Sequence, residues 1–192
     1  MGAPAGGDLR NDQAVSAAGT VVISGAPGTG KSTVGTFLSD ALGLPFLSLD
    51  VIKETLGDCL GTGDEAWSDL LGDTAAEVVF RSTAAFPSAV VEGWWRGDRR
   101  ERALREFEGC VEVFCRCEPA VAEARMRGRH DEDRHPIPRD VINPSLLDRA
   151  AHLAETVVPL GVGSVVIEID TTWGVDRVRL LSDVRAALKG AG

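Results

Sequence analysis

The chain has 192 residues, a formal net charge of −9 and 44% hydrophobic residues, which is typical of one globular domain with a substantial core. The acidic balance argues against nucleic acid as the main partner, because that binding depends on Lys and Arg neutralising phosphates. No apolar run approaches the length that spans a bilayer, and residues 1–19 lack the basic-then-apolar order of a signal peptide. We therefore expect a cytoplasmic protein with no membrane partner.

Strand-like apolar runs alternate with helix-like stretches, and this alternation predicts an α/β fold with a parallel sheet wrapped by helices. Strands are expected at 20–24, 45–49, 88–92, 111–115 and 165–169. Helices are expected at 31–42, 51–59, 65–85 with a break near Gly72, 99–108, 118–128, 145–158 and 176–188. Residues 1–19 are rich in Ala and Gly and are expected to form a flexible tail, followed by one domain over 20–190.

The octapeptide GAPGTGKS at residues 25–32 matches the pattern G-x-x-x-x-G-K-[ST] at every fixed position. It follows an expected strand and opens an expected helix, which is the context of a phosphate-binding loop (P-loop, or Walker A motif). Its glycines let the backbone turn N–H groups inward around an anion, and the helix adds its positive end. We predict that it binds a nucleotide through Gly25, Ala26, Pro27, Gly28, Thr29, Gly30, Lys31, Ser32 and Thr33, with Lys31 on the β- and γ-phosphates and Ser32 on Mg²⁺.

Ligands of parallel α/β sheets bind at the carboxyl ends of the strands. Besides the P-loop, those ends carry Asp50, residues 92–96 and residues 170–173. The chain has no Asn-Lys-x-Asp motif, which argues against a guanine-specific protein. The third strand ends in the single carboxylate of Glu92 rather than an acidic pair, which argues against a motor protein.

Residues 25–35, together with Leu38, Leu42 and Asp50, resemble the small P-loop kinases, such as gluconate kinase, shikimate kinase and chloramphenicol phosphotransferase. Residues 50–54 and 92–95 are most similar to the broad AAA_33 group of kinase-like proteins. The resemblance implies a three-layer α/β/α fold with five parallel strands ordered 2-3-1-4-5. It also implies transfer of the γ-phosphoryl group of ATP to a hydroxyl.

The same resemblance implies a lid at about 129–143 and assigns arginines of the lid and its approach to Arg125 and Arg129. With Arg134, these arginines are candidate clamps for phosphate, because phosphoryl transfer needs cations where charge spreads in the transition state. Surface exposure on a helix is the alternative for each of them.

Asp50 matches the carboxylate that such kinases carry after strand two, where it acts as a base or orients the acceptor. The alternative is that Asp50 caps the following helix. Glu92 is a candidate for contact with Mg²⁺, directly or through water, or with the acceptor, and otherwise an ordinary strand-end carboxylate. The candidate metal ligands are thus Ser32, Asp50 and Glu92. Which of the two carboxylates lies nearer the metal stays open.

Two further groups of residues are candidates for binding small molecules. Of the neighbouring Trp94 and Trp95, we expect one to pack in the core and the other to form an apolar wall for the acceptor. Arg99 is expected either to face the cleft or to lie on a solvated helix face. Trp173 is expected to border the adenine or to serve as a packing residue.

The sequence thus predicts an ATP- and Mg²⁺-dependent kinase that phosphorylates a hydroxyl of a small molecule, such as a metabolite, a sugar acid or an antibiotic-like compound. Three alternatives stay open. One is a nucleoside or nucleotide kinase of the same fold. Another is a nucleotide-binding regulatory ATPase without kinase activity, and the third is a toxin-like kinase that acts on a nucleotide sugar.

Overall fold

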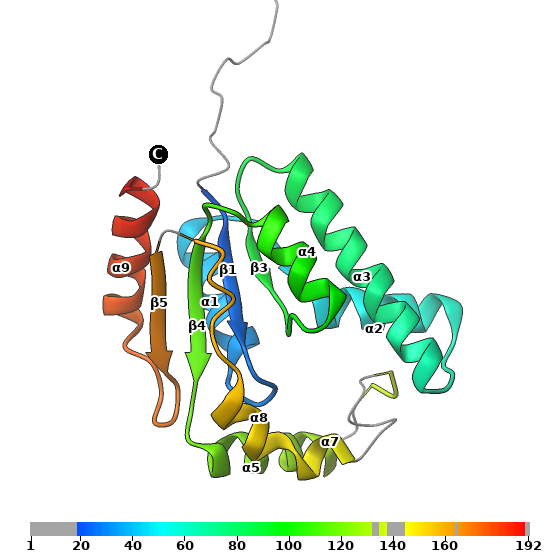
Figure 1. Ribbon diagram of the computed structural model, residues 1–192. Helices are drawn as coiled ribbons and strands as arrows, with labels where there is room; N and C mark the ends of the chain where they lie inside the picture. Colours follow the sequence, from blue (N-terminus) through cyan, green and yellow to red (C-terminus); the bar gives the residue numbers. More distant parts are fainter. Residues whose placement is uncertain (1–18, 132–134, 138–144, 164, 191–192) are drawn as a thin grey trace, which may run out of the picture.

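A five-stranded parallel sheet forms the centre of the fold (Figure 1), and its strand order is β2-β3-β1-β4-β5. The computed structural model describes residues 19–131, 135–137, 145–163 and 165–190. The strands are β1 (Val21–Gly25), β2 (Phe46–Ser48), β3 (Val90–Glu92), β4 (Val111–Arg116) and β5 (Val165–Asp170). The predicted sheet and its order are therefore confirmed, and each strand starts within two residues of its expected position.

Helices connect consecutive strands and cover both faces of the sheet, as parallel strands require. Those of the described residues are α1 (Lys31–Leu42), α2 (Leu49–Leu60), α3 (Glu65–Ala85), α4 (Asp98–Glu106), α5 (Pro119–Asp131), α7 (Ser145–Asp148), α8 (Ala150–Thr156) and α9 (Arg177–Gly190). In the part of the chain that the structure describes, no helix combines the length and the apolar character needed to cross a bilayer.

The alternating side chains of β1 divide the core into two halves. Val22 belongs to the cluster that includes buried residues of α3 and α4, whereas Val21 and Ile23 belong to the cluster that includes α1 and α9. This is the two-residue period of a strand that is buried on both sides. The arrangement is the three-layer α/β/α fold that the resemblance implied, and it places the carboxyl ends of β1, β2 and β3 next to one another.

The helical part of the fold differs from the prediction in three places besides small shifts of helix ends. The expected break near Gly72 is wrong, because α3 continues through this residue. A Cβ at Gly72 would lie 2.8 Å from Nη2 of Arg99, so the glycine makes room for a packed guanidinium group. The expected helix at 145–158 is divided into α7 and α8 at Arg149, whose N–H donates to Leu146 O three residues back. Helix α5 runs past Gly128.

Part of the expected lid lies outside the described residues, as do Arg134 and residues 1–18 of the expected tail. Of the stretch 129–143, the structure describes the end of α5 and residues 135–137. Ile137 is fully buried, and His135 Nε2 lies 2.9 Å from a carboxylate oxygen of Asp58 in α2. The described part of this stretch therefore contacts α2.

A buried carboxylate in β4 holds the chain segment that leads toward β5. The Glu112 side chain is fully buried and accepts hydrogen bonds from Leu160 N at 2.8 Å and from Gly161 N at 2.7 Å. The Ser24 hydroxyl donates to it as well. Since each of these bonds ends on a carboxylate in the core, Glu112 stabilises the fold.

We expect Glu112→Gln to lower the free energy of unfolding by about 3 kcal/mol, because the amide nitrogen cannot accept a backbone N–H. Urea denaturation monitored by circular dichroism measures this loss. The same substitution at the exposed Glu108 is the control, and it is expected to change the value by less than about 0.5 kcal/mol. Equal denaturation midpoints for the two variants would contradict the assignment.

Candidate active site

A cavity of about 590 Å³ lies where β1, β2 and β3 end, and the P-loop forms one of its walls. Residues from α2, from the segment after β3, from α5 and from the segment before α9 form the other walls. This is the position at which open α/β sheets bind ligands, and the sequence placed its candidate residues there.

The P-loop backbone adopts a conformation that only glycine tolerates well. Gly28 and Gly30 have φ values of 83° and 79°, in the left-handed region. A Cβ at Gly28 would also lie 2.5 Å from the Ala122 carbonyl oxygen, so α5 packs directly against the loop. The loop ends as the N-cap of α1, which has no side-chain cap. The first N–H groups of α1 thus keep the bonding capacity that a phosphate would use.

Some residues of the P-loop line the cavity, and the others lie outside its lining. The residues that line the cavity are Pro27, Gly28, Gly30, Lys31, Ser32 and Thr33. Ala26 and Thr29 are buried and hold the shape of the loop, because the Thr29 hydroxyl and Lys31 Nζ both donate to Ala26 O, at 2.7 and 2.9 Å. Gly25 lies behind the lining with a φ of 140°. The loop therefore presents an ammonium group, a hydroxyl and backbone N–H groups to the cavity, and these fit a chain of phosphates.

Glu92 is a buried carboxylate at the end of β3, on the side of the cavity next to Lys31. It is 1% exposed, and the Ser48 hydroxyl donates to its Oε2 at 2.7 Å. Burial raises the pKa of Glu92 above its ordinary value, and the nearby Asp50 carboxylate adds to this, whereas Lys31 and Arg129 oppose it. Asp50, Glu92 and Lys31 are therefore close enough to act on one another through their charges.

The raised pKa of Glu92 has a consequence for stability, because the folded chain binds this proton more tightly than the unfolded chain does. Stability from Glu92 protonation is then present at low pH and is lost as the pH rises from the ordinary value of 4.5 through the folded-state pKa. Glu92→Gln is expected to remove this loss, so the mutant gains stability relative to the wild type as the pH rises through that window. Urea denaturation of the nucleotide-free proteins across pH is the measurement. Glu168→Gln, at an exposed residue of β5, is the control, and parallel profiles for wild type and Glu92→Gln would refute this role of burial.

Asp50 lies in the first turn of α2 and is exposed to the cavity. The alternative that it caps this helix is wrong, because the N-cap is Ser48, whose hydroxyl accepts from Val51 N at 3.5 Å. Sequence reasoning missed Ser48, although a serine at a strand end just before a helix is a common N-cap signal. The Ser48 hydroxyl thus joins the start of α2 to Glu92, and the Asp50 carboxylate is not used as a cap.

Arg125 reaches from α5 across the edge of the P-loop. Its Nη2 donates to Thr171 O at 2.8 Å, and its Nη1 donates to Thr171 Oγ1 at 3.1 Å and to Gly28 O at 3.4 Å. Thr171 Oγ1 in turn donates to Thr29 O at 2.9 Å. Arg129 lies one helical turn after Arg125 and also lines the cavity. Two of the three predicted arginines are therefore beside the P-loop, and the third, Arg134, lies outside the described residues.

The two tryptophans after β3 point in different directions. Trp95 is buried in the core with ring centroids 5.6 Å from Phe80 and 5.3 Å from Phe107. Trp95 is therefore the member of the pair that packs in the core, and as a candidate substrate residue it lies outside the lining of the cavity. Trp94 does line the cavity, and the guanidinium of Arg96 lies 5.2 Å from its ring centroid.

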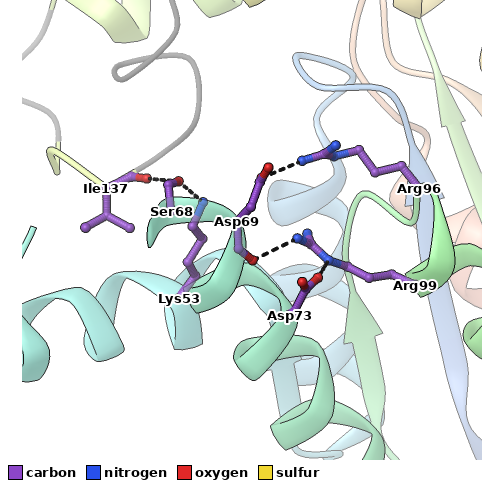
Figure 2. A network of polar contacts seen from close by, with 7 residues as sticks. All are labelled: Lys53, Ser68, Asp69, Asp73, Arg96, Arg99 and Ile137. Atoms are coloured by element: carbon purple, nitrogen blue, oxygen red, sulfur yellow. Dashed lines mark hydrogen bonds and ion pairs between the residues drawn. The ribbon is translucent and has the colours of Figure 1, made fainter. Parts of the chain in front are cut away.

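A polar network connects α2, α3 and the segment after β3 (Figure 2). Arg99 lines the cavity, which is the first of the two alternatives expected for it. Its Nε lies 2.5 Å from Asp73 Oδ1. Arg96 pairs with Asp69 at 3.0 Å. Lys53 of α2 also lines the cavity, and sequence reasoning missed it, whereas Arg96 lies in the stretch 92–96 that was expected at a strand end. The signal that was available for Lys53 is its spacing of three residues from Asp50, which puts both on one helix face.

The segment after β5 contributes backbone and aliphatic groups rather than an indole. Trp173 is 90% exposed and does not line the cavity, so the structure does not bring it together with the other predicted site residues. Gly174 and Val175 line the cavity in its place. The Arg177 guanidinium lies 5.1 Å from the ring centroid of Phe37, and both residues line the cavity as well.

Comparisons with known proteins show which proteins this chain is similar to. The chain is 29% identical over 177 residues to a shikimate kinase of Paracidovorax citrulli (strain AAC00-1), and the match covers 90% of this chain and 93% of that protein. A candidate kinase from Chloroflexus aurantiacus J-10-fl has a similar structure, with a TM-score of 0.78, 27% identity and coverage of 88% of this chain and 97% of that one. A gluconokinase from Sinorhizobium meliloti 1021 shares the fold, with a TM-score of 0.56, 18% identity and coverage of 91% and 94%.

These relatives confirm the resemblance to P-loop small-molecule kinases that the sequence indicated. The sequence model of the AAA domain family AAA_33 matches residues 21–150, a range that runs from β1 to the first residue of α8 and contains the P-loop, Asp50 and Glu92. The chain therefore belongs to the AAA_33 family of AAA domains.

Proposed function

We propose that the protein is a kinase that transfers the γ-phosphoryl group of ATP to a hydroxyl group of a small molecule. The observation that carries this proposal is the layout of one cavity. The P-loop with Lys31 lines this cavity, and Asp50 and Trp94 line it as well. A nucleotide and a second compound can therefore meet in one space, which direct transfer requires.

The residues of the cavity suit the charge changes of such a transfer. A bond forms between the acceptor oxygen and the γ-phosphorus, the bond from that phosphorus to the β–γ bridging oxygen breaks, and ADP leaves with the electron pair. Lys31, Arg125 and Arg129 line the cavity, and in this proposal their positive charge stabilises the charge that spreads over the phosphoryl oxygens in the transition state. In this proposal, Asp50, which lines the same cavity, receives the proton that the hydroxyl loses.

Mg²⁺ fits the oxygen atoms that face the same space. The Ser32 hydroxyl and the carboxylates of Asp50 and Glu92 line the cavity, and Mg²⁺ prefers such ligands together with phosphates and water. In the described part of the chain, no group of three or more His, Cys, Asp or Glu side chains could hold a metal ion. We propose that the ion is shared with the nucleotide, whose negative charge it would neutralise.

The test is a screen for a phosphorylated product. The full chain is incubated with Mg²⁺ and ATP labelled at the γ-phosphate, together with separate pools of hydroxylated carboxylic acids, polyols, nucleosides and nucleoside monophosphates. A labelled product that forms only with an acceptor pool supports the proposal, and the pool identifies the acceptor class. Release of labelled inorganic phosphate at one rate in every pool would instead favour the regulatory ATPase.

A further inference from the structure

Lys53 is a buried cation in the wall of the cavity. Its side chain is 8% exposed, and its Nζ donates to the Ser68 hydroxyl at 2.7 Å. Ser68 Oγ donates onward to the backbone carbonyl of Ile137 at 3.1 Å (Figure 2). A hydroxyl group does not neutralise an ammonium group, and a buried ammonium without an anion is costly.

The other cations of this network have carboxylate partners. Arg96 pairs with Asp69, and Arg99 pairs with Asp73, both carboxylates coming from α3. In the part of the chain that the structure describes, no carboxylate lies within ion-pair distance of Lys53 Nζ. The network of Figure 2 therefore contains three cations and two carboxylates, and Lys53 is the cation without a matching partner.

Burial makes it harder for Lys53 to hold its proton. Removal from water lowers the pKa of Lys53 below its ordinary value, while the more distant carboxylates of Asp50 and Asp69 raise it in part. An anion bound beside Nζ would favour the charged form and would supply the compensation that the protein itself does not.

Lys53 and Asp50 lie three residues apart on α2, and both line the cavity. Side chains at this spacing lie on one face of a helix, with Cβ atoms about 5–6 Å apart. We infer that Lys53 determines acceptor specificity by binding an anionic group of the acceptor, a carboxylate or a phosphate ester, about one helical turn from the hydroxyl that faces Asp50. This inference rests on the proposed function, because it assigns the second compound of that same cavity.

The first experiment compares charged and uncharged forms of the same acceptors. One arm uses shikimate and gluconate beside their neutral amides, and the other uses nucleoside monophosphates beside the free nucleosides, so the arms separate carboxylate from phosphate. We expect Lys53→Met to raise KM for the charged acceptor about 10- to 100-fold, the loss of one charge-assisted hydrogen bond, and to leave kcat/KM for the uncharged form unchanged. Lys189→Met, in the last turn of α9, is the matched control.

Two results would overturn the inference. One is an uncharged acceptor that is used as well as its charged form by the wild type. The other is an equal effect of Lys53→Met on the charged and the uncharged acceptor. An equal loss of kcat with both acceptors would make Lys53 a positioning residue for Asp50 rather than a residue that binds the acceptor.

A second experiment does not depend on turnover. The chain has three lysines, so lysine labelled at Cε gives three side-chain signals by NMR, which single Lys→Met variants assign. The P-loop is first filled with the non-hydrolysable analogue AMPPNP and Mg²⁺, and sodium phosphate or sodium acetate is then added. We expect the Lys53 signal to shift and its pKa to rise, with the Lys189 signal unchanged. A Lys53 signal that responds to neither anion overturns the inference.

The two experiments separate the inference from the proposed function. Anion binding at Lys53 without phosphorylation of any acceptor would contradict the kinase function and keep the anion site. Phosphorylation of an acceptor, with no response of Lys53 in either experiment, would support the kinase function and contradict the anion site.

Discussion

Replacement of Lys31 with methionine is expected to lower the rate of phosphoryl transfer about 1,000-fold, because it removes a cation at the point where negative charge develops. Lys31 Nζ is held 2.9 Å from Ala26 O in the P-loop and faces the cavity, so its position is set before any nucleotide binds. Nucleotide affinity is expected to fall about 10- to 100-fold as a charge-assisted hydrogen bond is lost.

The measurements are steady-state kinetics with an acceptor from the screen and calorimetry with AMPPNP and Mg²⁺. Lys189→Met carries the same change of charge on α9 and is expected to match the wild type. A Lys31→Met variant that transfers phosphate at the wild-type rate would contradict the role of the P-loop in catalysis.

Replacement of Asp50 with asparagine is expected to lower kcat about 100- to 10,000-fold, the usual contribution of a general base. Asp50 is exposed in the first turn of α2, and Ser48 caps that helix, so the substitution removes a charge from the cavity without removing a cap. The affinity for AMPPNP is expected to stay within about twofold of the wild type, since the binding residues of the P-loop are unchanged.

Kinetics and calorimetry on the same preparation separate these two effects. Asp40→Asn, at an exposed residue of α1, controls for the change of net charge. If kcat stays at the wild-type value in Asp50→Asn, this carboxylate has no part in proton transfer and the acceptor hydroxyl lies elsewhere in the cavity.

The sequence predicted those parts of the molecule that depend on local patterns. Apolar runs alternate with helical stretches, which gave the strand positions, and the resemblance gave the order of the sheet. The P-loop could be identified because its glycines are required by the backbone itself, as the left-handed φ of Gly28 and Gly30 demonstrates. The sequence predicted that one of the adjacent Trp94 and Trp95 packs in the core. It did not predict which of the two is buried.

The sequence could not predict what depends on how helices pack against each other. Lys53, Arg96 and Ser68 come together only because α2, α3 and the segment after β3 meet at one side of the cavity. The break expected at Gly72 did not occur, because a helical glycine costs only about 1 kcal/mol and the stability of helices in proteins comes mostly from tertiary packing.

Trp173 lies apart from the cavity for a related reason. Residues 171–174 form a turn in which Gly174 N donates to Thr171 O at 3.3 Å, with a φ of 110° at Gly174. The turn directs the Trp173 ring to the solvent and brings Gly174 and Val175 to the cavity. The direction of a side chain in such a turn depends on backbone angles that the order of residues does not reveal.

Calorimetric titration of the intact chain with AMPPNP in the presence of Mg²⁺ tests the central claim most directly, because every proposed step begins with a nucleotide held at the P-loop. We expect saturable binding of one nucleotide per chain, weakened about 10- to 100-fold in Lys31→Met and unchanged in Lys189→Met. Absence of binding to the wild type, or equal binding to the wild type and Lys31→Met, would contradict it.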